Sequence, residues 1–144
     1  MSRNSPVYEK SKRFASRIVR LHSYLSEKKC EHVISSQIIR SGTSIGANIA
    51  EAIYAASRRD FLSKITIAQK ECAETLYWLD LLIENAFIDG AAAKDLLSDC
   101  DEILRMLVAT TKKLRTSTYD EVRESADDYD ADFVNPLTEG GEPL

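Results

Sequence analysis

The sequence predicts an all-α protein: an antiparallel up-and-down four-helix bundle over residues 1–116, followed by an acidic tail over residues 117–144. Three observations support this fold class. Apolar residues recur every three or four positions through most of the chain, which is the period of an amphipathic helix. Only five Gly and three Pro are present, and two of each lie in the last nine residues, so the body has few helix breakers. The connections between the periodic segments are short, which favours antiparallel neighbours.

The first two predicted helices have clear apolar faces. Ser5-Pro6 is a good helix start, because Ser caps free N–H groups and Pro suits the first turn. The helix ends near Lys28, and its apolar face contains Val7, Phe14, Ile18, Leu21 and Leu25. A second helix is expected from about Glu31 to Tyr54, and its periodic positions include Ile38, Ile45, Ile49 and Ala52.

The third and fourth predicted helices follow a cap and a turn. Ser57 can cap the third helix, with Asp60 as the acidic half of a capping box. Asp89-Gly90 is a turn, and the fourth helix is expected from about Ala91 to Arg115. The apolar residues of these two helices include Phe61, Ile65, Ala68, Cys72, Leu76, Leu79, Leu96, Cys100, Ile103 and Leu107.

Charge is distributed unevenly along the chain. Residues 117–144 hold nine acids and one base, a formal charge of −8, whereas residues 1–116 hold 18 bases and 14 acids, a formal charge of +4. Low hydrophobicity with high net charge favours disorder, so the tail is expected to be disordered or partly ordered. The apolar runs are too short to span a membrane, the N-terminus lacks a secretory signal, and the three cysteines read as free thiols, so a cytoplasmic location is expected.

The segment from Arg40 to Ala52 is unusually rich in small residues for the middle of a helix. Gly42 and Gly46 are four apart and share a face, and each costs up to about 1 kcal/mol relative to Ala. We interpret them as marking a close approach of two helices, where a larger side chain would not fit. The alternative is a concave anion or ligand site built over the small residues.

Polar residues on the second and third helices predict a seam between them. If the two helices face each other, Arg40 or Lys64 can pair with Glu51, Glu71 or Glu74. Such pairs can specify one helix register or a subunit contact, although buried ion pairs are weak evidence for stability. The predicted structural or assembly seam comprises Arg40, Gly42, Ser44, Gly46, Asn48, Glu51, Lys64, Glu71, Glu74 and Trp78.

No pattern in the sequence indicates catalysis, a metal site or a cofactor. A di-iron bundle needs Glu-x-x-His motifs, and neither His22 nor His32 has an acid three residues before it. Cys72 and Cys100 lie on apolar faces, where small core residues are expected. Glycine-rich phosphate loops and nucleophile elbows are absent from the sequence, so the protein is not expected to be an enzyme.

A basic stripe on the first helix is the candidate functional surface. Lys10, Arg13, Arg17 and Arg20 are spaced by three, four and three residues, and a positive stripe suits the phosphates of nucleic acid. Repetition of the stripe around a symmetric oligomer would strengthen its field. The alternative is an ordinary solvated face. The predicted nucleic-acid-binding residues are Lys10, Arg13, Arg17, Arg20, Lys28 and Lys29.

Two segments resemble a known bacterial family. Residues 37–52 contain an Arg-Ser-x-x-Ser-Ile-x-Ala-Asn-Ile-Ala-Glu core, and residues 60–82 contain a Lys-Glu-x-x-Glu-Thr-Leu-Tyr-Trp-Leu run. Over about residues 5–115 the chain is similar to the four-helix-bundle proteins encoded in intervening sequences of 23S ribosomal RNA genes. The resemblance implies a ring-like homopentamer. It also implies a relationship to the accessory variability protein of diversity-generating retroelements, a basic pentameric barrel that binds nucleic acid and a reverse transcriptase.

Two functional hypotheses follow. The first is a homo-oligomeric, non-enzymatic scaffold that binds RNA or DNA through the basic surface of the first helix, with contacts to phosphates and none to bases. The second is a protein–protein adaptor or structural oligomer without a nucleic-acid role. In that case the acidic tail recruits a basic partner or screens the basic face. Neither hypothesis involves a membrane.

Overall fold

The computed structural model describes residues 4–121 and 135–137, with only the backbone described for 117–121. It contains four helices: α1 (Pro6–Lys28), α2 (Val33–Ile53), α3 (Arg58–Glu84) and α4 (Gly90–Glu121). No β-strand occurs within the described ranges, so the all-α prediction is confirmed. None of the helices among these residues is long and apolar enough to cross a membrane.

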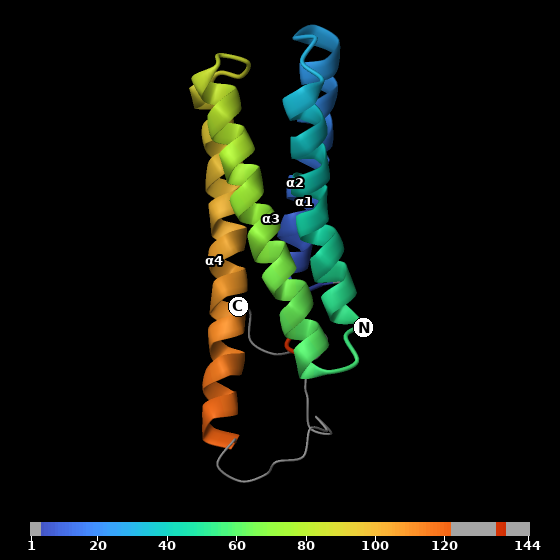
Figure 1. The fold of residues 1–144 in the computed structure, drawn as a ribbon, viewed down its shortest axis with the longest axis vertical. Helices are drawn as coiled ribbons and strands as arrows, with labels where there is room; N and C mark the ends of the chain where they lie inside the picture. Colours follow the sequence, from blue (N-terminus) through green and yellow to red (C-terminus); the bar gives the residue numbers. More distant parts are fainter. Residues whose placement is uncertain (1–3, 122–134, 138–144) are drawn as a thin grey trace.

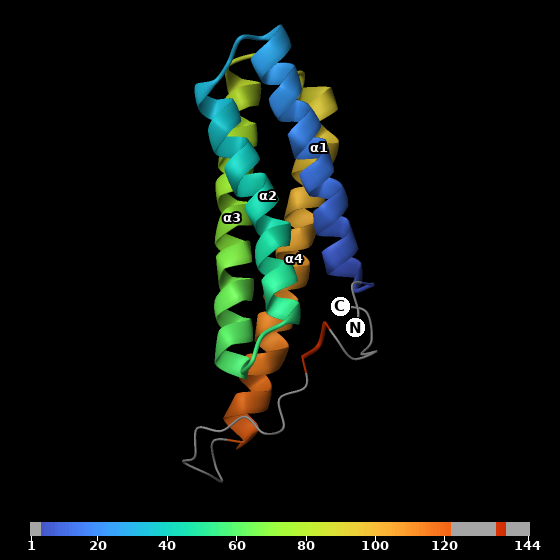
Figure 2. The same cartoon turned by 90° about the vertical axis from the view of Figure 1, so that its right-hand side faces the viewer.

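The four helices form an up-and-down bundle (Figure 1). Each helix packs against two neighbours: α1 against α2 and α4, and α3 against α2 and α4. Consecutive helices are antiparallel, so the start of α1, the end of α2, the start of α3 and the end of α4 share one end of the molecule (Figures 1 and 2). We call this the tail-side end, because the C-terminal tail leaves α4 there.

Two of the helix starts are where the sequence predicts them, and the start of α2 is not. The Ser5 hydroxyl accepts from the Tyr8 amide, and the Ser57 hydroxyl accepts from the Asp60 amide at 3.1 Å, as the sequence predicts. The start of α2 differs by two residues from the prediction. Glu31 lies before the helix and uses its carboxylate as the cap: it accepts from the amides of Val33, Ile34 and Ser35 at 2.7–3.0 Å. Because three free N–H groups are satisfied by one carboxylate, the helix begins after Glu31.

The helix ends also deviate from simple patterns. Ala86 follows α3 with φ 59°, a left-handed conformation in which glycine is usual. The Ala86 amide donates to the Ile83 carbonyl, and the Phe87 amide donates to the Leu82 carbonyl at 2.9 Å, which completes a Schellman-type end. The fourth helix continues to Glu121, past the predicted end at Arg115, because residues 91–121 contain neither Gly nor Pro.

One continuous core runs along the bundle axis and consists of the predicted apolar faces. Its largest fully buried side chains are Phe14, Phe61, Ile18, Leu25, Ile38, Ile45, Ile49, Ile65, Leu79, Leu82, Ile103 and Leu107. Cys72 and Cys100 lie in this core and face each other, with the Cys100 thiol 3.5 Å from the Cys72 carbonyl oxygen. A hydrogen bond with Cys100, together with burial, raises the pKa of the Cys72 thiol, so Cys72 is a small neutral core residue.

Part of the predicted tail is ordered against the bundle. Residues 117–121 continue α4, so the helix takes up the first five residues of the tail. Leu137 is 2% exposed and belongs to the core cluster, and Asn135 is also buried. The remaining tail residues, for which the sequence predicts disorder, lie outside the described residues.

Candidate nucleic-acid interface and polar seam

The two glycines of α2 face α1. A Cβ atom on Gly42 would lie 2.9 Å from both Cγ atoms of Ile18, and a Cβ on Gly46 would lie 3.2 Å from the Ser11 hydroxyl. A Cβ at 2.9 Å would force the core to shift. The glycines therefore permit a close approach of α1 and α2, which agrees with the packing interpretation of this segment. The space over Gly42 and Gly46 is filled by Ile18 and Ser11.

The predicted ionic seam lies on the other side of α2, against α3. The Arg40 guanidinium pairs with Glu71 at 3.5 Å and more closely with Glu74. The Trp78 indole also donates to the Glu74 carboxylate, at 3.1 Å. Two of the predicted residues on α3 thus pair with one arginine from α2, and Trp78 donates to one of these two carboxylates. This cluster fixes how the two helices are aligned along their length.

The rest of the seam divides into one further ion pair and two local contacts. Lys64 donates to Glu51 at 2.7 Å, nearer the tail-side end. Ser44 and Asn48 bond within α2: the Ser44 hydroxyl donates to the Arg40 carbonyl and the Asn48 amide donates to the Ser44 carbonyl. These two residues satisfy their polar groups inside their own helix. Their place in an assembly contact stays a prediction.

The structure adds a buried polar contact that the sequence did not indicate. The Thr75 hydroxyl donates to the Ser41 hydroxyl at 2.9 Å, and both side chains are fully buried between α2 and α3. The periodic signal was available, since Ser41 and Thr75 both occupy core positions of their helices. Small hydroxyl residues at such positions are, however, common in helix packing without a cross-helix bond.

The carboxylates of the seam have opposite electrostatic environments. A hydrogen bond from Arg40, supported by one from Trp78, holds the pKa of Glu74 below its ordinary value. Glu71 is more deeply placed, with 17% of its side chain exposed, and burial raises its pKa despite the attraction of Arg40. The hydrogen bond from Arg40 is therefore the main influence on Glu74, whereas burial is the main influence on Glu71.

The basic stripe of α1 is divided by its contacts with α4. Lys10 and Arg17 turn toward that helix: Arg17 donates to Asp99 at 2.7 Å, and Lys10 lies 2.8 Å from Glu102 and 3.4 Å from Asp99. The hydrogen bond that Lys10 donates to Glu102 raises the pKa of Lys10. Two of the six predicted nucleic-acid-binding residues are therefore occupied by carboxylates of the same molecule.

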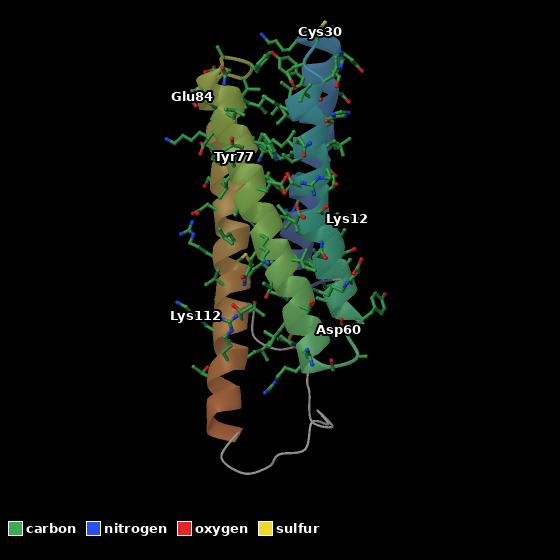
Figure 3. All side chains as sticks on the ribbon, viewed as in Figure 1. Lys12, Cys30, Asp60, Tyr77, Glu84 and Lys112 are labelled. Atoms are coloured by element: carbon green, nitrogen blue, oxygen red, sulfur yellow. The ribbon has the colours of Figure 1, made fainter. Side chains whose placement is uncertain are left out.

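The other four predicted residues are exposed but lie in different places. Arg13 and Arg20 point to solvent on α1, and neither forms an ion pair with any residue that the structure describes. Lys28 and Lys29 are also exposed, at the opposite end of α1 near Cys30 (Figure 3). The six residues consequently do not form one continuous free stripe.

The antiparallel arrangement separates charge along the bundle. When each helix is divided at its middle, the tail-side half (residues 6–17, 43–70 and 106–121) has 11 bases and five acids, a formal charge of +6. The opposite half (residues 18–42 and 71–105) has six bases and 11 acids, a formal charge of −5. Lys112 and Asp60 lie toward the tail-side end in Figure 3, whereas Glu84 lies at the other end.

Seven cations of the tail-side half are exposed and form no ion pair within the described part of the chain. They lie on three helices, and only two of them are on α1: Lys12, Arg13, Arg59, Lys70, Lys112, Lys113 and Arg115. Reading each helix separately missed this grouping. The signal was nevertheless present, because in an antiparallel bundle the base-rich ends of α1, α3 and α4 must meet at one end.

The described residues do not suggest a reactive centre. No group of three His, Cys, Asp or Glu side chains among them could hold a metal ion. The ion pairs join two helices, except the pair of Arg105 and Asp101 within α4, and their acidic groups are already engaged by bases. The charged side chains therefore align the helices and give the surface its charge.

Comparison with known proteins places the fold. The model of the 23S rRNA-intervening sequence protein family matches residues 3–109. A crystal structure of a Bacteroides thetaiotaomicron protein of unknown function, from the S23 ribosomal protein family, is 48% identical, with a TM-score of 0.72. The similarity covers 72% of this chain and 96% of that one. No curated protein matches. Because the family model matches well over half of the residues, the chain belongs to the 23S rRNA-intervening sequence protein family.

Proposed function

We propose that this protein is a non-enzymatic, self-associating helical scaffold that binds RNA or DNA by its phosphates. The observation that supports this function is the group of seven exposed cations on the tail-side half, which form no ion pair with any residue that the structure describes. Clustered Lys and Arg side chains neutralise phosphates and release counterions, which provides affinity without base recognition. Of the residues predicted on α1, Arg13 belongs to this group, whereas Lys10 and Arg17 are engaged by α4.

A four-residue charge reversal tests the proposal. The variant replaces Lys12, Arg13, Lys112 and Lys113 with Glu, and all four side chains are exposed, so the bundle should stay folded. Binding of a fluorescent 20-nucleotide single-stranded RNA is measured by anisotropy between 50 and 200 mM salt. We expect affinity to fall at least about tenfold, and the slope of log K against log salt to flatten by up to about 3.

A matched control reverses Arg20, Lys28, Lys29 and Lys94, four exposed cations of the opposite half. Both variants change the net charge equally. If position matters, the control should lose much less affinity than the tail-side variant. Equal losses would point to total charge and would contradict an interface on the tail-side half.

Self-association is supported by apolar side chains that remain on the surface. Ile67 and Tyr77 on α3 are 36% and 59% exposed, and Val19 and Tyr24 on α1 are also exposed. Tyr77 packs edge-to-face on Trp78, with ring centroids 4.9 Å apart, which holds an aromatic surface on α3. Light scattering of the purified protein tests this part of the proposal. A mass equal to one chain at all concentrations would contradict it.

The adaptor hypothesis uses the same apolar surface. It would be favoured over nucleic-acid binding if Tyr77→Ala abolished association with a protein partner while the charge reversal had no effect on any interaction.

A further inference from the structure

Three residues of the tail bind to one end of the bundle as a compact unit. The Asn135 side-chain amide donates to the Ala52 carbonyl at 2.6 Å. The Asn135 side-chain oxygen accepts from the Leu137 amide at 3.0 Å, which closes a turn around Pro136. The Leu137 side chain is 2% exposed and belongs to the core cluster. The Asn135 side chain thus joins the segment to the bundle and also holds the shape of the segment.

The bundle supplies a polar and an apolar part of this contact at its tail-side end. Ala52 belongs to the last turn of α2, where helix carbonyls lack a complete set of intrahelical donors. The Ala52 carbonyl also accepts from the Ala55 amide at 3.1 Å, so this acceptor has a fixed position. Val7 and Ile53, at the start of α1 and the end of α2, are buried and belong to the same core cluster as the leucine. Figure 2 shows residues 135–137 beside these two helix ends.

The segment has the properties of a separable peptide ligand. Its internal hydrogen bond joins residues that are two positions apart, and the ring of Pro136 fixes φ at about −65°, so the segment loses little conformational freedom when it binds. The family model ends at residue 109, so the segment lies outside the matched part of the chain, whereas Val7, Ala52 and Ile53 lie inside it. The site and the segment that fills it therefore come from separate parts of the chain.

The two hydrogen bonds require asparagine at the first position of the segment. The Asn135 NH₂ group is a donor and faces a carbonyl, whereas its oxygen is an acceptor and faces an amide. An aspartate would place a carboxylate oxygen against the Ala52 carbonyl, and the hydrogen bond to the bundle would be lost. Two positions later, the buried Leu137 requires an apolar side chain. The matching ligand is thus a short peptide with Asn two residues before Leu.

From these observations we infer that the tail-side end of the bundle is a binding site for an Asn-x-Leu peptide, and that residues 135–137 of the same chain occupy it. The site consists of the Ala52 carbonyl and the apolar surface that includes Val7 and Ile53. A ligand attached to its own receptor has an effective concentration of about millimolar, so an added peptide of the same chemistry binds only by displacing it. The inference does not depend on the proposed nucleic-acid binding.

The site is tested with the synthetic peptide acetyl-Val-Asn-Pro-Leu-Thr-amide, titrated into the full chain and followed by NMR. The double variant Asn135→Asp, Leu137→Asp releases the segment and leaves the site open. The amide signals of Ile53 and Ala55 should shift when the peptide is added to this variant, and the signal of Lys28 at the other end should not. The variant should bind the peptide at least about tenfold more tightly than wild type does, because wild type has its own ligand in place.

Two altered peptides are the matched controls. The peptides with Asn135→Asp or Leu137→Ala should each bind the open site at least about tenfold more weakly, because one loses the hydrogen bond to the bundle and the other loses the buried leucine. Equal binding of the three peptides would overturn the inference. The inference would also be overturned if the peptide bound wild type and the variant equally, or if it did not bind a variant that circular dichroism shows to be folded.

Wild type provides a second measurement that needs no variant and that decides the question if the variant does not fold. Peptide in excess over the effective concentration should displace the attached segment. The methyl signals of Leu137 should then move to the positions of an unstructured leucine, while those of Ile53 change little because the same contacts form again. Leu137 signals that stay in place would contradict a separable ligand. Leu137 signals that depend on protein concentration would place the ligand on a second copy and would contradict occupancy by the same chain.

Discussion

Ile18 of α1 occupies the space that a side chain on Gly42 of α2 would need. Both Cγ atoms of Ile18 would lie 2.9 Å from a Cβ on that glycine, and the branching carbon itself would lie at 3.3 Å. Ile18 is fully buried and β-branched, so it has little freedom to turn away. The distance between α1 and α2 is therefore set at this contact.

Gly42→Ala should destabilise the protein by about 1–2 kcal/mol, because overpacking exceeds the gain in helix propensity. The loss is measured by urea unfolding followed by circular dichroism. Gly46→Ala is the matched variant on the same helix: the nearest atom to its Cβ would be the Ser11 hydroxyl at 3.2 Å, with two further Ser11 atoms at 3.6 Å, so a change within about 0.5 kcal/mol is expected. Equal losses for the two variants would contradict the steric explanation.

Ala86→Gly should stabilise the protein by roughly 0.5–1 kcal/mol, because Ala86 adopts a left-handed conformation after α3 that glycine adopts without strain. Thermal unfolding monitors the gain. Ala92→Gly, at an exposed position within α4, is the control and should lower stability by up to about 1 kcal/mol. A loss of stability in both variants would show that Ala86 is not strained.

Asp99→Asn should release Arg17 from α4, since Asp99 is the carboxylate that Arg17 contacts, whereas Lys10 keeps its closer contact with Glu102. The groups are partly exposed, so the stability loss should stay under about 1 kcal/mol. Affinity for the single-stranded RNA should rise about twofold as one further cation becomes available. Asp101→Asn alters net charge equally but affects only the Arg105 pair within α4, and it should raise affinity less. Identical increases would exclude a specific release.

The two seam carboxylates that pair with Arg40 should respond oppositely to pH. The pKa of Glu74 is lowered by Arg40, so its contribution to stability is present above its ordinary value of 4.5 and is lost as the pH falls through the lower folded value. The pKa of Glu71 is raised, chiefly by burial, so its contribution is largest below 4.5 and declines as the pH rises through the higher folded value.

Measurements of unfolding free energy at pH 3 and pH 7 separate the two carboxylates. Glu74→Gln should cost more at pH 7 than at pH 3, by less than about 1 kcal/mol because the group is partly exposed. Glu71→Gln should be more favourable, relative to wild type, at pH 7 than at pH 3. Parallel pH dependence of the two variants would contradict these assignments.

Features that depend on neighbouring residues in the chain were predictable. The helix starts at Ser5 and Ser57 follow from a side chain that accepts from an amide three residues later. The apolar faces follow from periodicity alone. Gly42 and Gly46 indicated close packing, because glycine destabilises the middle of a helix unless a close contact requires it. The Glu31 cap was missed, because a glutamate before a helix is not distinguished by sequence from one inside its first turn.

Features that depend on how helices rotate against each other were not predictable. One side of α1 carries Lys10, Arg13, Arg17 and Arg20. The sequence does not show which of these four side chains contact α4 and which face solvent. The edge of α4 separates Lys10 and Arg17 from the exposed Arg13 and Arg20, and it involves Asp99, which is 82 residues from Arg17. The basic tail-side half likewise emerges only when the ends of α1, α3 and α4 are brought together.

The contrast among the three cysteines has a practical consequence for labelling. Thiol-reactive reagents attack the thiolate, and Cys72 and Cys100 are buried in the core, where the pKa of Cys72 is raised. Cys30 is exposed at the turn between α1 and α2, at the end away from the tail. The native chain thus carries one natural attachment point for a fluorophore or a surface tether, and it leaves the basic half facing the solution.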